Sequence, residues 1–132
     1  MAAGTFNFTS LINGLTENVS GHVQKVAVNI HKGAIEHSRL DTGKTKNNWE
    51  ATVDTISTAD RDAIETGNRK TYARLSANTN AARQRGASNI SKFSLARNNE
   101  FIAIVNNTDY FPPWNEQDST AILAIREALA AT

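Results

Sequence analysis

LINGLTENVSGHVQKVAVNIHKGA (residues 11–34) places apolar side chains at the spacing of a single helix face. The recurring positions are Leu11, Leu15, Val19, Val23, Val26, Ile30 and Ala34. Thr9 or Ser10 can cap the start of such a helix, and basic residues crowd its end, where the helix carbonyls favour cations. The sequence therefore predicts one helix over about residues 9–38.

A helix of this length exceeds the expected size of its own domain. It would be roughly 43 Å long, whereas a compact chain of 132 residues has a diameter of roughly 36 Å. Either Gly21 or Gly33 breaks the helix, or one end projects and buries its apolar residues against another subunit. We expect the second alternative, and hence a homo-oligomer.

The segments downstream of this helix predict a small sheet. Residues 49–57 (WEATVDTIS) alternate apolar and polar side chains, which is the period of a half-buried strand. Residues 93–97 and 100–106 have the pattern of an antiparallel hairpin, because the intervening Asn98-Asn99 tolerates the positive φ of a tight turn.

The C-terminal region predicts a further helix, which Asp118 or Ser119 can cap. The apolar residues that share a face of this helix are Ala121, Ile122, Ile125, Ala128 and Leu129. The predicted fold is therefore α+β, with a long N-terminal helix, a small antiparallel sheet, a middle basic helix and a C-terminal helix. Residues 1–132 have the length of a single domain, in which residues 1–8 are expected to form a flexible N-terminal arm.

Composition excludes several classes of protein. The net charge of +1 gives no overall bias towards nucleic acid or membranes. There is no cysteine, and His31 and His37 lack the spacing of metal ligands, so we expect no metal and no cofactor. The N-terminus lacks the features of a secretory signal, and the apolar run Phe101–Val105 is too short to span a membrane. We therefore expect a soluble cytosolic protein without a membrane partner.

Two strings that look catalytic overlap in SRLDTGKTKNNW (residues 38–49). Asp-Thr-Gly at residues 41–43 is the triplet of aspartic proteases, and Gly-Lys-Thr at residues 43–45 matches the end of a phosphate-binding loop. The phosphate loop lacks its first glycine, where Ser38 stands, and it follows a helix instead of a strand. Basic neighbours would hold Asp41 ionised at the surface, unlike the shared carboxylates of a protease.

A turn explains these residues better than either kind of site. The side chains of Asp41 and Thr42 can bond nearby backbone N–H groups, and Gly43 supplies a positive φ. Trp49 is then the first anchoring residue of the strand. The sequence therefore predicts no catalytic residue, and an enzyme built on Asp41 or Lys44 is the least favoured hypothesis.

A long N-terminal helix, the turn LDTGK (residues 40–44) and a strand that begins at Trp49 resemble the neck and tail-completion proteins of tailed bacteriophages. Further along, IVNNTDY (residues 104–110) is similar to a strand of that family that ends in asparagines and is followed by a tyrosine. The chain departs from the family in FPPW (residues 111–114), where an acidic residue and a glycine are usual.

This resemblance implies a structural protein without catalytic activity. Members of the family assemble as a ring at the phage neck, join the DNA-filled head to the tail, and leave a channel for the genome. The resemblance thus implies a homo-oligomeric ring in the virion, assembled in the host cytoplasm. Its implied partners are other neck, connector or tail proteins, with non-specific contact to genomic DNA in the channel.

The middle of the chain is basic, since no acidic residue occurs between Glu65 and Glu100. The basic residues of this stretch are Arg69, Lys70, Arg74, Arg83, Arg85, Lys92 and Arg97. If residues 69–85 are helical, three of them lie within roughly 60° of one another, opposite the apolar residues. These three are Lys70, Arg74 and Arg85, and the opposite residues are Tyr72, Leu75 and Ala82.

Three interpretations of this basic surface remain open. It is a solvated face balanced by acidic residues just upstream, a contact for an acidic neighbouring subunit, or a contact for DNA phosphates. The residues predicted to face a partner or DNA are Arg69, Lys70, Arg74, Arg83 and Arg85. The alternative function is accordingly a small oligomeric DNA-binding protein that uses residues 69–97. Stacking aromatic residues are few, so sequence-specific or single-strand binding is not expected.

The segment YFPPW (residues 110–114) is predicted to form a rigid cover over the edge of the sheet. An exposed Trp114 would instead make it a docking anchor for a partner. The residues of this candidate docking loop are Tyr110, Pro112, Pro113 and Trp114.

Overall fold

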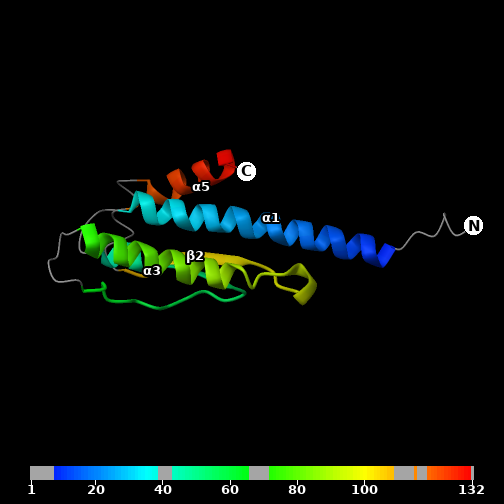
Figure 1. Ribbon diagram of the computed structural model, residues 1–132, viewed down its shortest axis with the longest axis horizontal. Helices are drawn as coiled ribbons and strands as arrows, with labels where there is room; N and C mark the ends of the chain where they lie inside the picture. The colour runs from blue at the N-terminus through cyan, green and yellow to red at the C-terminus, as the bar shows by residue number, and fades with distance from the viewer. Residues whose placement is uncertain (1–7, 39–42, 66–71, 109–114, 116–118, 132) are drawn as a thin grey trace, which may run out of the picture.

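The computed structural model describes residues 8–38, 43–65, 72–108, 115 and 119–131. The elements in chain order are α1 (Phe8–His37), α2 (Lys44–Asn47), β1 (Trp49–Val53), α3 (Tyr72–Ile90), the 3₁₀ helix η1 (Leu95–Arg97), β2 (Ile102–Asn106) and α5 (Thr120–Ala131). The fold is α+β, as predicted. Figure 1 shows α1 running along the molecule, with α5 on one side and α3 and the sheet on the other.

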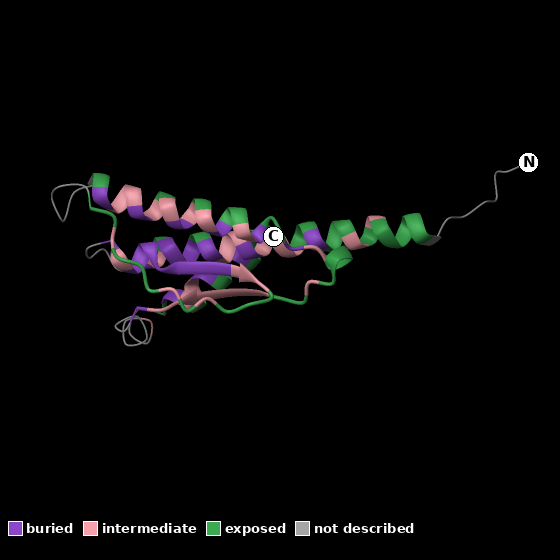
Figure 2. Ribbon diagram, turned by 90° about the horizontal axis from the view of Figure 1, so that it is seen from below, coloured by how far each residue is buried: buried purple, intermediate pink, exposed green. Residues whose placement is uncertain are grey.

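The first helix agrees with the predicted span of residues 9–38 to within one residue at each end. It continues through Gly21 and Gly33, so neither glycine breaks it. Its 30 residues give a length of about 45 Å. The N-terminal end of the helix extends beyond the rest of the described chain and is largely exposed (Figure 2).

The sheet has two antiparallel strands, in which Trp49 pairs with Asn106 and Val53 pairs with Ile102. The prediction that the first strand extends to residue 57 is wrong, because Asp54 has a φ of 58° and turns the chain out of the strand.

Asp54 also fixes the start of β2. Its carboxylate accepts hydrogen bonds from the backbone N–H of Glu100 at 2.7 Å, from Asn99 Nδ2 at 2.7 Å and from the backbone N–H of Phe101 at 3.1 Å. These bonds hold the pKa of the carboxyl below its usual value, because they favour the charged form. Asp54 therefore joins two strands that are distant in the sequence.

The predicted hairpin between residues 93–97 and 100–106 is wrong. Leu95–Arg97 is a 3₁₀ helix, and the partner of β2 is β1. Asn98 does adopt the positive φ that was expected of it, at 62°. The turn was therefore located correctly, but only one of its two flanking segments is a strand.

The segment before that turn is held by α1. Ser20 Oγ accepts the backbone N–H of Leu95 at 2.9 Å, and Gln24 Nε2 donates to the carbonyl of Phe93 at 2.6 Å. The Phe93 side chain is buried. These contacts replace the ladder that a hairpin partner would have supplied.

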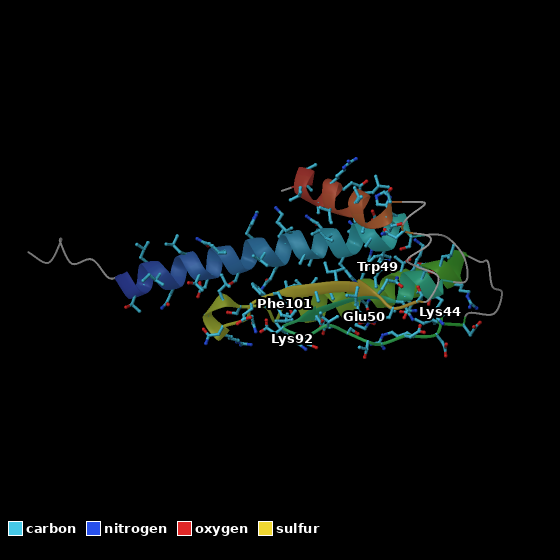
Figure 3. The ribbon with its side chains drawn as sticks, turned by 180° about the vertical axis from the view of Figure 1, so that it is seen from behind. Lys44, Trp49, Glu50, Lys92 and Phe101 are labelled. Atoms are coloured by element: carbon cyan, nitrogen blue, oxygen red, sulfur yellow. The ribbon has the colours of Figure 1, made fainter. Side chains whose placement is uncertain are left out.

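The core lies between α1, α3, α5 and one face of the sheet, and it is built largely of small residues. Among the described residues ten apolar side chains are buried, and six of these are alanines. One cluster contains Ala34, Ile35, Trp49, Ala82 and Ala124. Trp49, the largest of them, lies between α1 and the strands (Figure 3). The helices can therefore approach closely, but few large side chains anchor them.

The C-terminal helix packs on α1 through Thr120, Ala124 and Ala128, which are its buried residues. Ile122, Ile125 and Leu129, which share a face with Ala121 and Ala128, are 54, 43 and 61% exposed. Most of the apolar face identified in the sequence therefore lies outside the core. Asn115 Oδ1 accepts the N–H of Ala121 at 2.9 Å in the first turn of this helix.

The two residues predicted to cap that helix are not seen to do so. Asp118 lies outside the described residues. Ser119 is exposed and has a φ of 55°, and its backbone carbonyl accepts the N–H of Leu123 at 3.0 Å. Ser119 thus stands at the N-cap position through its backbone, while the side-chain hydrogen bond to the first turn comes from Asn115, a residue not predicted for this role.

Residues 56–65 form neither a helix nor a strand, and asparagine side chains hold them in place. Asn48 donates from Nδ2 to the carbonyl of Arg61 at 2.7 Å and accepts the N–H of Arg61 at 2.6 Å. Asn78 accepts the N–H of Ile64 at 2.7 Å and donates to its carbonyl at 3.2 Å. These side-chain amides thus pair with the segment as the backbone of a neighbouring strand would.

Candidate functional site

The predicted turn lies partly within the described chain. Gly43 has the expected positive φ, at 88°, and directly precedes α2. Asp41 and Thr42, the other two residues of the turn, lie outside the described residues. Trp49, the predicted anchor, is 4% exposed and donates from Nε1 to Oγ of Ser38 at 2.5 Å.

Arg74 and Arg85 face the interior of the molecule, so the prediction that they face a partner or DNA is wrong. The Arg74 side chain is 3% exposed and makes a two-pronged contact with the carboxylate of Glu65. Arg85 contacts Glu50. For Arg74 the cause is the register of α3, in which every fourth residue from Arg74 to Ile90 is buried. These residues are Arg74, Asn78, Ala82, Gly86 and Ile90.

The remaining residues of the predicted basic surface are Arg83, Arg69 and Lys70. Arg83 Nη2 donates to Oε1 of Glu36 on α1 at 2.7 Å, and both side chains are partly exposed. Arg69 and Lys70 lie outside the described residues. The interpretation that upstream acidic residues balance the charge holds for Arg74, whose carboxylate partner precedes it in the chain.

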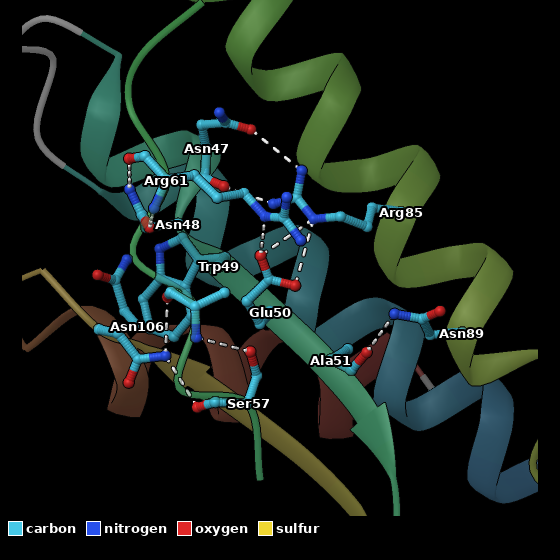
Figure 4. Close-up of polar contacts among 12 residues, drawn as sticks. Asn47, Asn48, Trp49, Glu50, Ala51, Ser57, Arg61, Arg85, Asn89 and Asn106 are labelled. Carbon is cyan, nitrogen blue, oxygen red and sulfur yellow. Dashed lines mark hydrogen bonds and ion pairs between the residues drawn. The ribbon is translucent and has the colours of Figure 1, made fainter. Parts of the chain in front are cut away.

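Glu50 is the centre of a polar cluster that the sequence analysis did not identify (Figure 4). Its side chain is 3% exposed and lies between Arg61 and Arg85, with 2.5 Å between Arg61 Nε and Oε1 and 3.2 Å between Arg85 Nε and Oε2. Arg85 Nη1 also donates to Oδ1 of Asn47 at 3.1 Å. The cluster ties α3 to β1 and to residues 56–65, which is a structural role.

His31 is a second buried polar residue that the sequence analysis did not assign. Its Nε2 lies 2.9 Å from the carbonyl oxygen of Trp49, and because a carbonyl only accepts, Nε2 carries the hydrogen. Burial lowers the pKa of His31 below 6.5, and the positive charge of Arg85 lowers it further. The hydrogen bond to Trp49 acts in the opposite direction and raises the pKa. Gly86 leaves room for the ring, because a Cβ there would lie within 2.9 Å of Nε2.

We expect stability to fall as the pH drops below about 6.5. In that range the unfolded chain binds a proton at His31, whereas the folded chain does not until its own, lower pKa is reached. Urea unfolding at pH 7.5, 6.5 and 5.5 should show this loss, and His31→Gln should reduce its slope. His22→Gln, at an exposed position of the same helix, is the control and should keep the wild-type slope. Equal slopes in all three proteins would contradict this account.

An apolar groove runs along the molecule between α1, the sheet and α5. It consists of two adjoining hollows of about 240 and 290 Å³, which share Ile30, Ile102 and Ile104. The other lining residues are His22, Val23, Val26, Ala27, Ala34, Trp49, Ala121, Ala124 and Ile125. The lining side chains carry no carboxylate, lysine or arginine, so the groove suits an apolar occupant.

The N-terminal part of α1 presents a complementary feature. Residues 9–19, hereafter the overhang, precede Ser20, the first buried residue of the helix. Their large apolar side chains and exposed fractions are Leu11 45%, Ile12 58%, Leu15 55% and Val19 49%. The overhang therefore has an apolar stripe that the described part of the chain leaves about half exposed.

A separate hollow of about 420 Å³ between α1, α2 and α3 is lined mainly by polar side chains, among them the paired Glu36 and Arg83. Lys46, which is 5% exposed, donates from Nζ to the carbonyl of Ile35 at 2.7 Å, and burial lowers the pKa of its amine. This contact satisfies a carbonyl in the last turn of α1. Within the described chain no three His, Cys, Asp or Glu residues are grouped so that they could hold a metal ion.

Two further sequence predictions concern the candidate docking loop and Lys44. The candidate docking loop, residues 110–114, lies outside the described residues. Lys44 has its Nζ 3.5 Å from Oδ1 of Asp60. Among the described helices none has both the length and the hydropathy to cross a membrane.

No protein-family model, curated protein or solved structure matches the chain. The function is therefore inferred from the residues and their geometry alone. Within the described part of the chain, the overhang and the groove are apolar surfaces that remain partly open.

Proposed function

We propose that the protein is a non-enzymatic structural subunit of a tailed-phage neck or tail, and that copies of it form a ring joining head to tail around the DNA channel. Two lines of reasoning support the proposal. The first is the resemblance carried by the LDTGK turn (residues 40–44), Trp49 and the strand before residues 106–110. The second is the overhang, an exposed apolar helix end that is suited to contact between subunits.

The overhang is the observation that carries the proposal. Helices in water owe most of their stability to packing of their apolar face, and the large apolar side chains of this segment are 45–58% exposed. The small, alanine-rich core leaves a substantial share of the chain's large apolar side chains on the surface. A repeated contact between copies would bury them.

The DNA-binding alternative has less support. It depended on Lys70, Arg74 and Arg85 acting together, and two of the three are paired with carboxylates of the same chain. In the proposed ring, DNA would occupy the channel without sequence-specific contacts. Other neck, connector or tail proteins would bind the two faces of the ring in the virion, after assembly in the host cytoplasm.

Native mass spectrometry of the purified protein, with and without a short DNA duplex, tests the proposal directly. A closed ring of defined copy number that ignores the duplex would support it. A dimer that binds the duplex with a steep dependence on salt would favour the DNA-binding alternative.

Substituting the overhang stripe is expected to dissolve the ring while leaving the subunit folded. In Leu11→Ser/Leu15→Ser/Val19→Ser three half-exposed side chains lose the burial that a partner supplies. At roughly 1 kcal/mol each, this weakens association by about 100-fold. Sedimentation velocity measures the loss of the ring, and circular dichroism checks the fold.

The matched control for this variant is Asn13→Ser/Asn18→Ser, which changes exposed polar residues of the same helix segment. It should assemble like the wild type. If the triple variant still forms the ring, the overhang is not part of the contact between subunits.

A further inference from the structure

We propose that the contact between neighbouring copies is heterologous, with the overhang of one copy lying in the apolar groove of the next. This inference rests on the proposed ring, and it specifies which two surfaces meet. The occupant of the groove is thus a second copy of this chain, and the surface that docks is residues 9–19 of α1.

The two surfaces agree in length. The overhang has 11 residues and is about 16 Å long as a helix. The groove follows α1 from His22 to Ala34, a distance of about 18 Å along the helix axis. A helix the size of the overhang can therefore lie along the full groove without extending far beyond it.

The two surfaces also agree in chemistry. Glu17 is the single charged residue of the overhang, and it lines a hollow beside η1 together with Ser20 and Arg97. At about 100° per residue it lies roughly 160° around the helix from Val19 and Leu15. The apolar stripe and the groove can therefore be brought together without removing a carboxylate, lysine or arginine from water.

A heterologous contact covers more of the exposed apolar surface than symmetric pairing of two overhangs. Symmetric pairing would leave the groove open, together with the outward residues of α5. Ile125 lines the groove, and Ile122 and Leu129 stand three and four residues from it on the same face. An overhang in the groove would cover Ile125 and lie beside Ile122 and Leu129, so one contact brings three apolar surfaces together.

The size of the contact favours a closed assembly over a pair. Half the lateral surface of a helix about 16 Å long and 10–12 Å wide gives roughly 280 Å², hence roughly 550 Å² for both partners. This is below the roughly 1,200–2,000 Å² of stable interfaces, so one contact alone is weak. In a ring each copy uses both its overhang and its groove, and a heterologous contact that closes generates such a ring.

Cysteine cross-linking tests the inference, because the chain has no cysteine of its own. Leu15→Cys marks the overhang, and Ile125→Cys marks the groove at a side chain that is 43% exposed. The two full-length proteins, one carrying a small mass tag, are mixed and treated with a short bis-maleimide. We expect mixed 15–125 products in roughly tenfold excess over 15–15 and 125–125 products, because the contact joins unlike surfaces.

Asn13→Cys is the control, since it lies roughly 160° around the overhang from Leu15. It should give few mixed products with Ile125→Cys. The pair Leu15→Cys and Ile30→Cys repeats the test at the middle of the groove, where the direction of the docked helix does not matter. Circular dichroism of each variant confirms that it is folded.

The outcomes separate this inference from the proposed function. Predominant 15–15 products, or a wild-type ring in native mass spectrometry without 15–125 products, would overturn the overhang-in-groove contact and leave the ring standing. Absence of both the ring and any cross-link would overturn both. A double variant Leu15→Cys/Ile125→Cys that yields a ladder ending at the copy number of the native ring would support both.

Discussion

Replacing Glu50 with alanine is expected to lower the free energy of unfolding by about 3 kcal/mol, the lower end for breaking a buried ion pair. The carboxylate is 3% exposed, and the Nε atoms of Arg61 and Arg85 lie 2.5 and 3.1 Å from its Oε1. Without it Arg85, whose side chain is 21% exposed, keeps Asn47 as a partner but loses its counter-ion. Arg61 is 44% exposed and can turn to solvent, which is why the lower end applies.

Urea unfolding at neutral pH measures this loss. The matched control is Asp60→Ala, which removes a carboxylate whose Oδ1 lies 3.5 Å from Nζ of Lys44 on the surface. That substitution should cost less than about 1 kcal/mol, as exposed ion pairs do. If Glu50→Ala cost no more than the control, Glu50 would have no part in holding α3 to β1.

Gly43→Val is expected to destabilise the protein by about 3 kcal/mol or more, since two effects add. A β-branched residue at a φ of 88° is strained by about 1–3 kcal/mol. In addition, a Cβ at this position would lie 2.7 Å from Nδ2 and 2.9 Å from Cγ of Asn78. Asn78 is fully buried and binds Ile64 through two hydrogen bonds, so displacing it also releases part of residues 56–65.

Gly14→Ala provides the control for this second experiment. Gly14 lies inside α1 with nothing within 4 Å of an added Cβ, so alanine should raise stability by up to about 1 kcal/mol. Thermal and urea unfolding of both variants compare a constrained glycine with an unconstrained one. A Gly43→Val protein as stable as the wild type would show that the turn tolerates a side chain.

Features encoded by local periodicity were predictable from the sequence. The apolar positions of α1, from Leu11 to Ala34, span about six and a half turns and have no competing pattern, so both ends of that helix were placed within one residue. Gly43 and Asn98 have the positive φ that their residue types favour. Trp49 is buried at the start of a strand, as the alternation of residues 49–53 indicated.

Pairing between distant segments was not predictable in the same way. An asparagine turn flanked by apolar runs favours a hairpin, but here Asp54 binds residues 99–101 and directs β2 to β1. The contacts that decide this pairing join Asp54 to residues that are 45 to 47 positions further along the chain. No local sequence pattern contains both partners. The end of β1 was missed for the same reason.

The basic residues of α3 were identified correctly, but they were predicted to face a partner or DNA, whereas the described arginines of this helix pair with carboxylates of the same chain. Arg83 meets Glu36 and Arg85 meets Glu50, which are 47 and 35 residues away. A stretch without local acidic residues therefore looked unbalanced, although its counter-ions lie elsewhere in the chain. The groove was missed because it is formed by helices and strands that meet only in the folded molecule.

The asparagines that hold residues 56–65 also make the fold sensitive to chemical ageing. Asn48 Nδ2 donates to the carbonyls of both Lys44 and Arg61, and its Oδ1 accepts a backbone N–H. Hydrolysis of the amide to aspartate would replace the donor with an oxygen that faces two carbonyl oxygens. Asparagine is among the thermolabile residues. Of the 15 asparagines in this chain, those buried against the backbone of residues 56–65 are therefore the ones whose deamidation would disturb the fold.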